Sequence, residues 1–344
     1  MPSYELSWGF DWNNNIDGGD TATTTKNAII ALKSAFTADL EDHAGTPAAF
    51  TSGKWAVVSS CDGVTADGTD RWVDNTDIEF NYPGSAHSWI LLSKADYPTT
   101  GVTTYVIIDC RDVSPYTDVS VIWSTVAPTG GSVTACPTTN ATYTYDDMLA
   151  RYIAAWSPTN VSYAHASRSA RGDVFFGTWR QGYGYPWYSL LTLQLDTPRV
   201  SDPWPLYIAH SEYFGGVGAL ATTTGGIGLS SYTNGKTFWT SGQKNATYGF
   251  FSYPCTPQSS AGGYAQAIID VNGDDIDGKY PQLPIFIASM YSGFYSVRGR
   301  LVDFWSGPHG TPAPVLGTVT PAAGTPEYCL WGHVWVPCNQ APLV

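Results

Sequence analysis

The stretch Thr103-Thr104-Tyr105-Val106-Ile107-Ile108-Asp109-Cys110 decides the fold class of this chain. It is rich in β-branched and aromatic residues, and it is as short as a typical strand. Comparable stretches flank it at residues 55–61, 88–93 and 119–123, with Gly, Pro, Asn and Asp between them. Apolar runs of this length that are separated by turn residues predict antiparallel strands.

Two helices are expected among these strands. The first covers residues 24–42, where Ile29, Leu32, Phe36 and Leu40 recur at helical spacing. The second covers residues 145–156, whose apolar residues share one helical face and end before a Pro. Before the first helix, residues 8–12 alternate like a short strand, and residues 13–20 are expected to form a loop.

The second half of the chain is predicted to contain strands and loops only. The expected strands are at 174–180, 187–195, 206–209, 250–253, 265–269, 285–290, 295–304 and 330–336. A length of 344 residues favours two domains. We place the boundary near Asn160, giving an N-terminal α+β domain at 1–160 and a C-terminal all-β domain at 161–344. The predicted fold is mainly β with one or two short helices, in two β-sandwich or barrel-like domains with long loops.

Charged residues make up only 13% of the chain, about half the usual share. A surface that is poor in charge and rich in Thr, Ser, Gly, Asn and Tyr suits polar contact with sister subunits, although a free β-protein with a neutral polar surface is an alternative. The net charge of -13 repels phosphate and argues against nucleic-acid binding. Arg168 and Arg171 come nearest to a basic patch.

Neither a leader nor a membrane span is expected. The start Met-Pro-Ser-Tyr-Glu has no basic or apolar region of the secretory kind, and no apolar run reaches the roughly 18 residues that a membrane helix needs. The six cysteines are too sparse for a disulfide scaffold, so reduced, buried thiols are the default. Cys329 and Cys338 are the best candidate disulfide, because a short hairpin could bring them together.

Motifs for catalysis are missing. The run Gly216-Val217-Gly218-Ala219-Leu220-Ala221 fits the spacing of a dinucleotide loop, but the Thr/Gly-rich continuation cannot supply the helix that this motif requires. No pair of carboxylates is selected by its spacing. Cys329, His333 and Cys338 fall short of the four closely paired ligands of structural zinc. We therefore predict no catalytic residues, no confident metal site and no enzymatic activity.

One acidic loop has the oxygen ligands that calcium prefers. Asp270, Asn272, Asp274 and Asp277 lie close together, but the EF-hand pattern would need Gly and Glu where Asp275 and Pro281 stand. Two interpretations remain, a looser Ca²⁺ loop and a solvated turn; no other cofactor is expected. A second acidic loop, residues 63–77, is equally explained as a solvated, turn-rich segment.

Aromatic residues gather around a predicted hairpin at residues 182–186. Tyr183, Tyr185 and Trp187 are the expected contact residues there, because side chains at a turn are more often exposed than those along a strand. Arg298 and Arg300 alternate along a predicted strand. They would face the same way and could pair with acidic loops of a neighbouring subunit, or equally with carboxylates of their own subunit.

Three short motifs carry a resemblance to a known class of protein. They are Asp70-Arg71-Trp72, His87-Ser88-Trp89-Ile90-Leu91-Leu92 and the segment Val297-Arg298-Gly299-Arg300-Leu301-Val302-Asp303-Phe304-Trp305. With the opening aromatic strand and helix, the chain resembles tailed-bacteriophage virion proteins of uncharacterised type. The resemblance implies a structural component present in many copies, in the tail, neck, baseplate or capsid surface.

These observations lead to one hypothesis and its rivals. The leading hypothesis is a non-enzymatic virion protein that folds in the host cytoplasm and contacts copies of itself and other virion proteins, without nucleic acid or membrane insertion. The alternative is a carbohydrate-binding or depolymerase-like protein that uses an exposed Trp/Tyr surface to hold a host-surface glycan. A secreted glycan-binding protein is a third class, and it would require a leader.

Overall fold

Over the residues that it describes, the computed structural model is mainly β with one helix, and its strands form two antiparallel sheets, neither of which closes into a barrel. It describes residues 8–16, 18–19, 21–41, 49–61, 87–113, 116–138, 150–156, 161–180, 185–196, 206–211, 250–252, 283–291, 294–306, 327–331 and 334–339.

The first sheet has the strand order β2-β3-β4-β5-β6, so that each strand pairs with its neighbour in sequence. Its strands are β2 (Ala56–Cys61), β3 (Ser88–Ala95), β4 (Thr103–Val113), β5 (Tyr116–Ser124) and β6 (Ala150–Trp156). Residues at alternate positions of β3 and β4 are buried on both faces of this sheet. Burial on both faces explains why these strands read as continuous apolar runs.

The second sheet has the path β1-β7-β8-β9-β13-β12-β11, with β10 paired to β9 and the β14–β15 hairpin joined to β13. Its strands are β1 (Trp8–Asn15), β7 (Val161–Ser169), β8 (Val174–Arg180), β9 (Tyr185–Asp196), β10 (Leu206–Ser211), β11 (Phe250–Ser252), β12 (Leu283–Tyr291), β13 (Phe294–Ser306), β14 (Glu327–Trp331) and β15 (Val334–Asn339).

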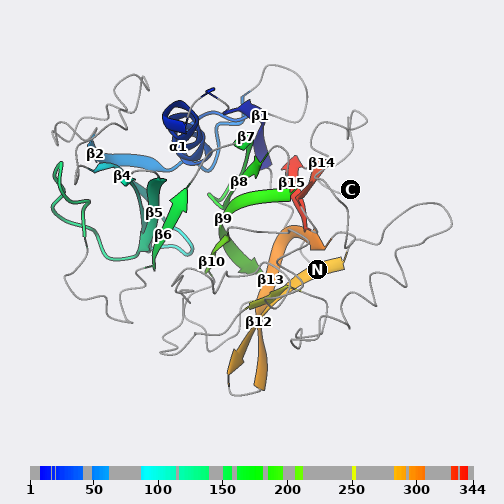
Figure 1. Cartoon of the computed structure of the whole chain (residues 1–344). Helices are drawn as coiled ribbons and strands as arrows, with labels where there is room; N and C mark the ends of the chain where they lie inside the picture. The colour runs from blue at the N-terminus through cyan, green and yellow to red at the C-terminus, as the bar shows by residue number, and fades with distance from the viewer. Residues whose placement is uncertain are drawn as a thin grey trace.

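The main core lies between the two sheets, and the helix α1 (Thr21–Thr37) closes it along one edge. Figure 1 shows α1 at the top of the molecule, between the first sheet on the left and β1, β7 and β8 on the right. Burying each large aliphatic or aromatic side chain stabilises the fold by about 1.5–3 kcal/mol. The core residues include Ile29, Leu32 and Phe36 of α1, Ile90, Leu92, Val106 and Ile108 of the first sheet, and Ala164, Ala166, Val174 and Phe176 of the second.

A buried arginine ends α1. The guanidinium of Arg168, on β7, donates to the carbonyl oxygens of Ala35 at 3.0 Å, Ala38 at 2.7 Å and Ser52 at 3.0 Å. The last carbonyls of a helix have no partner within the helix, and a cation is favourable at that end. Burial lowers the pKa of Arg168 to about 10, while the nearby Asp39 acts in the opposite direction. Arg168, which with Arg171 comes nearest to a basic patch in the sequence, is therefore a buried structural cap of α1.

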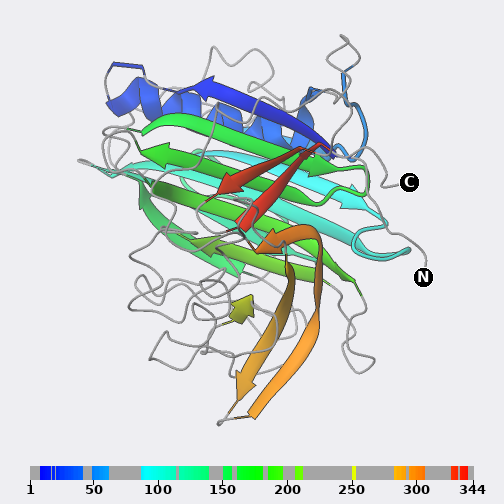
Figure 2. The ribbon, with the colours of Figure 1, turned by 90° about the vertical axis from the view of Figure 1, so that its right-hand side faces the viewer.

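One hairpin extends away from the rest of the described chain. Strands β12 and β13 pair along most of their length, and both views show them pointing away from α1 and the first sheet (Figures 1 and 2). The base of β13 pairs with β9, where Arg300 lies opposite Asp196 and Leu301 opposite Leu195. Among the described residues, the hairpin joins β9 and β15 through the base of β13, and the short strand β11 pairs with β12 on its other edge.

Most predicted strands are confirmed, with their ends shifted by a few residues. The helix predicted at 145–156 was wrong over its described part, because residues 150–156 form β6 and pair with β5. The first helix starts and ends earlier than the predicted 24–42. The strand predicted at 330–336 is two strands, β14 and β15. Strand β1 continues into the predicted loop through a register shift between Asp11 and Asn14. The strand predicted at 265–269 lies outside the described residues.

The barrel-like alternative is wrong, since neither sheet closes, while the sandwich-like form of two separate domains stays a prediction. The division into domains near Asn160 stays a prediction. Two observations bear on it: β1 pairs with β7 across that position, and the main core combines residues from both sides. The described helix, α1, has neither the length nor the apolar character of a membrane-spanning helix.

Candidate functional site

A small second core covers the outer face of the first sheet, opposite the main core. It consists of the buried residues Cys61, Trp89, Leu91, Ile107 and Cys136, with Tyr105 and Val133 packed against them. Cys136 and Val133 belong to residues 129–138, which we call the covering segment. Bridges from Thr129 to Thr138 and from Ser132 to Ala135 fold this segment back on itself.

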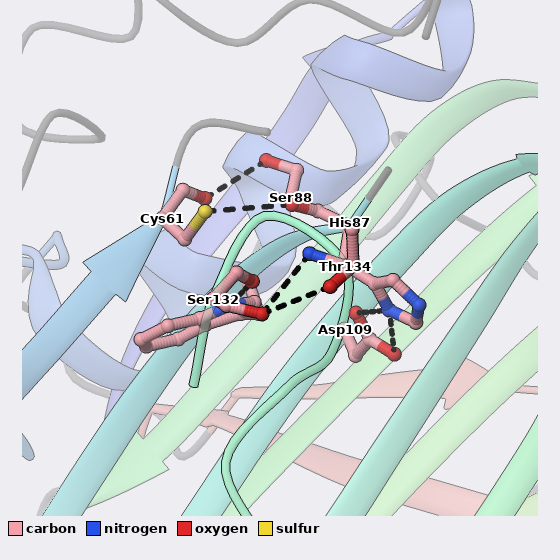
Figure 3. A network of polar contacts seen from close by, with 7 residues as sticks. Cys61, His87, Ser88, Asp109, Ser132 and Thr134 are labelled. Carbon is pink, nitrogen blue, oxygen red and sulfur yellow. Dashed lines mark hydrogen bonds and ion pairs between the residues drawn. The ribbon is translucent and has the colours of Figure 1, made fainter. Parts of the chain in front are cut away.

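A histidine and an aspartate meet where the covering segment joins the sheet. The Nδ1 atom of His87 lies 2.8 Å and 2.9 Å from the two carboxylate oxygens of Asp109 (Figure 3). His87 immediately precedes β3, and Asp109 lies on β4 opposite Trp89. Asp109 is 1% exposed and His87 is 9% exposed. A carboxylate on Nδ1 holds the ring in one orientation and leaves Nε2 as the other functional atom.

Backbone and hydroxyl groups surround this pair. The amide of His87 donates to the carbonyl of Val133 at 2.8 Å, and the indole of Trp89 donates to the carbonyl of Ser132 at 2.9 Å. On the other side, the thiol of Cys61 donates to the carbonyl of His87 at 3.6 Å. These bonds attach the covering segment and the end of β2 to the start of β3, and Figure 3 shows the bond from Cys61 to His87.

This outer-face cluster, centred on His87 and Asp109, can orient an imidazole, but its described residues do not complete a catalytic set. Within the described part of the chain, Nε2 of His87 has no hydrogen-bond partner, so no hydroxyl or thiol there is paired with it as a nucleophile would be. The hydroxyls of Ser132 and Thr134 contact each other at 3.2 Å instead. Among the described residues, no group of three His, Cys, Asp or Glu side chains could hold a metal ion.

A second polar cluster, which we call the inter-sheet clasp, joins the two sheets. Asp173, in the turn between β7 and β8, accepts hydrogen bonds from the Tyr97 hydroxyl at 3.0 Å and the Ser169 hydroxyl at 2.7 Å. Tyr97 follows β3 of the first sheet, and it is fully buried. The indole of Trp55 donates to the carbonyl of Gly172 in the same turn at 3.0 Å. Burial, and then the charge of Asp173, raise the pKa of Tyr97 well above its usual range.

Close backbone contact is built into the clasp. Gly53 has a φ of +72°, and a Cβ atom there would lie 1.9 Å from the carbonyl oxygen of Ser169. Gly172 has a φ of +110°, a backbone conformation that other residues rarely adopt. Only glycine fits both positions.

Cations gather near the clasp, although the chain as a whole is acidic. Lys94 donates to the carbonyl of Lys54 at 3.2 Å, and Lys54 pairs with Asp39. The guanidinium of Arg171 lies 3.6 Å from the Asp173 carboxylate. Burial, and then the charge of Arg168, lower the pKa of Lys94. The negative charge of the buried Asp173 carboxylate is therefore compensated by hydroxyl donors and by the positive charges around it.

A further buried histidine lies on the second sheet. The Nε2 atom of His165 is 2.9 Å from the Ser167 hydroxyl, and its ring lies 5.6 Å from that of Phe175. Burial lowers the pKa of His165 to about 3. This imidazole is a neutral core group at ordinary pH, packed under the aromatic side chains of the second sheet.

The predicted contact residues lie on the second sheet. Tyr185 is opposite Arg180 in the β8–β9 hairpin, and Trp187 lies in a register shift of that hairpin, between Pro186 and Tyr188. Tyr183 lies outside the described residues. Arg298 lies at a register shift of β13 and Arg300 is opposite Phe286. The structure thus places these residues on two hairpins, away from the outer-face cluster.

The other predicted sites are partly outside the described residues. Cys329 and Cys338 lie on the paired strands β14 and β15, but Cys329 is opposite Val336 and Cys338 falls at a register shift. Their disulfide stays a prediction, and His333 lies outside the described residues. The possible calcium residues Asp270, Asn272, Asp274 and Asp277, and the acidic loop at 63–77, lie outside them as well.

Sequence reasoning missed both polar clusters. The outer-face cluster could have been inferred from the sequence, because Asp109 interrupts the apolar run of β4. A carboxylate buried in such a strand needs a polar partner. Arg168, between Ser167 and Ser169, could likewise have been read as a buried charge that needs hydrogen-bond acceptors. No sequence signal connects Tyr97 with Asp173, because the two come together only when the sheets pack.

Comparison with protein-family models, with curated proteins and with solved structures found no match for this chain.

Proposed function

We propose that the chain is a non-enzymatic structural subunit that assembles in many copies, and that the assembly is a tailed-phage particle. The observation that carries the proposal is the β12–β13 hairpin, which extends from the second sheet (Figure 2). A particle subunit needs an element that reaches beyond its own core, and this hairpin has that form.

The composition of the hairpin supports contact with neighbours. Strand β12 has the sequence LPIFIASMY, which is mainly apolar at both alternating sets of positions. A strand of this kind is stable when both of its faces are covered. Among the described residues, β11 pairs with only three residues of β12, so much of the β12 edge has no described strand beside it. In the proposed assembly, neighbouring subunits supply part of the cover.

The use of polar groups in the described core supports a mechanical role. The inter-sheet clasp and the outer-face cluster attach strands and segments to one another through hydrogen bonds. Together with a charged content of only 13%, this arrangement suits a rigid subunit with a weakly charged contact surface.

Light scattering and native mass spectrometry of the full chain test the proposal. We expect a defined oligomer, and proteomics of intact particles should find the chain in many copies. Replacing Arg298 and Arg300 together by Glu should weaken the oligomer, whereas the charge reversal Lys26→Glu on α1 should leave it intact. A stable monomer that is absent from particles would overturn the proposal, and saturable polysaccharide binding by that monomer would favour the carbohydrate-binding alternative.

A further inference from the structure

Two of the five residues in the outer core of the first sheet are cysteines. Cys61 ends β2 at the edge of the sheet, and Cys136 lies in the covering segment. Both are buried, and both are thiols rather than members of a disulfide. We propose that they form a redox-dependent disulfide that fastens the covering segment to β2.

Fixed contacts hold the two elements beside each other. Cys61 lies directly opposite Trp89, and the Trp89 indole donates to the carbonyl of Ser132 at 2.9 Å. A Cβ on Gly131 would be 2.6 Å from the Trp89 ring and 3.0 Å from Pro137, so Gly131 lies against this ring and beside the residue that follows Cys136. The covering segment is therefore seated over the same tryptophan that β2 pairs with.

The chemistry requires an external oxidant of the disulfide class, such as oxidised glutathione. The S–H of Cys61 donates a hydrogen bond to the His87 carbonyl, so this sulfur carries its proton in the structure. One cysteine loses its proton and attacks the oxidant, which releases one glutathione thiolate and leaves a mixed disulfide. The second cysteine loses its proton and displaces the other glutathione. Two protons and two electrons leave the protein, one sulfur–sulfur bond forms, and the oxidant becomes two thiols.

Cys110 provides a control within the same sheet. Its side chain is buried in the main core, on the opposite face from Cys61 and Cys136. Burial, and then the charge of Asp109, raise the pKa of the Cys110 thiol well above its usual range. Because Cys110 faces the other side of the sheet, it cannot bridge to Cys61 or Cys136 without movement of the backbone.

The test is to equilibrate the folded full chain with oxidised and reduced glutathione, alkylate the remaining thiols under denaturing conditions, and map the linked peptides. We expect one peptide that joins Cys61 to Cys136, and reductant should reverse the link. Because the bridge closes a long loop, oxidation should raise the Tm of the wild type by roughly 5 °C. The same rise is expected for Cys110→Ser, and no such rise for Cys61→Ser or Cys136→Ser.

Two results would overturn the inference. One is that Cys61 and Cys136 stay fully alkylated after the oxidant has reacted with other cysteines of the folded chain. The other is that either residue links to a different cysteine. The inference does not depend on the proposed function, since it concerns the fold of a single subunit.

Discussion

Asp109 and Asp173 are both 1% exposed, but the structure satisfies them differently. Asp173 accepts from two neutral hydroxyls, and one of these, on Tyr97, belongs to the other sheet. Asp109 has both oxygens directed at the Nδ1 of His87, which immediately precedes the neighbouring strand β3. The comparison separates two uses of a buried carboxylate: the inter-sheet clasp joins segments that are distant in sequence, whereas the outer-face cluster orients a titratable ring beside a surface segment.

The largest expected effect is the loss of the clasp carboxylate. Asp173→Ala leaves the Tyr97 and Ser169 hydroxyls buried without their acceptor, and it should lower the free energy of unfolding by about 4 kcal/mol. Urea denaturation measures this change. The matched control is Asp96→Asn, at an exposed aspartate with a φ of 54° that Asn also tolerates, and it should change stability by less than about 0.5 kcal/mol. A cost below about 1 kcal/mol for Asp173→Ala would show that the clasp does not join the sheets.

The same contrast explains how much of the fold could be predicted from sequence. The strands of the first sheet were predictable, because burial on both faces gives continuous apolar runs such as Val106 to Ile108. Strand β7 was missed, because its inward residues Ala164 and Ala166 are small and resemble loop composition. Their size is set by the close approach of α1, and that packing is not visible in a single sequence.

The wrong helix has a different physical cause. Residues 150–156 contain Tyr152, Ile153 and Trp156, whose spacing fits a helical face, but this run is short enough to fit a strand as well. Pairing with β5 decides the outcome. The early end of α1 also depends on tertiary contacts, since Arg168 and the amide of Trp55 take the last carbonyls. In both cases tertiary contacts override the helix propensity of the local sequence.

The second prediction uses pH to separate the buried histidines. The folded protein protonates His165 only near pH 3, whereas the unfolded chain does so near 6.5. Between these values the unfolded state binds more protons, so stability falls as the pH falls. We expect His165 to account for a loss of about 2–3 kcal/mol between pH 7 and 4.5.

Urea denaturation at a series of pH values checks this contribution. His165→Gln should flatten the acid side of the stability profile relative to the wild type, whereas His87→Asn should keep the His165 contribution. If the wild type and His165→Gln lose stability in parallel as the pH falls, the buried histidine of the second sheet is not the acid-sensitive group.

The third prediction concerns the outer-face cluster itself. His87→Ala leaves the Asp109 carboxylate without its partner, but His87 is close enough to the surface for water to replace part of the interaction. We therefore expect a cost of about 2 kcal/mol, smaller than that of the clasp variant. His87→Asn should cost less than about 1 kcal/mol, because the amide nitrogen can take the position of Nδ1. Equal costs for Ala and Asn would mean that the hydrogen bond to Asp109 contributes little.

The smallest expected effect is the coupling energy between the two hydrogen bonds that Asp173 accepts. It distinguishes one cooperative cluster from two independent bonds. Tyr97→Phe and Ser169→Ala each remove one donor to Asp173, and each should cost about 1 kcal/mol. Since the two donors share one carboxylate, their double variant should depart from additivity by about 0.5 kcal/mol or more. Tyr97→Phe combined with His87→Asn should be additive, because the two residues belong to clusters with no shared partner. Additivity within the clasp would mean that each hydroxyl binds the carboxylate independently, and that the clasp is two separate hydrogen bonds rather than one cooperative unit.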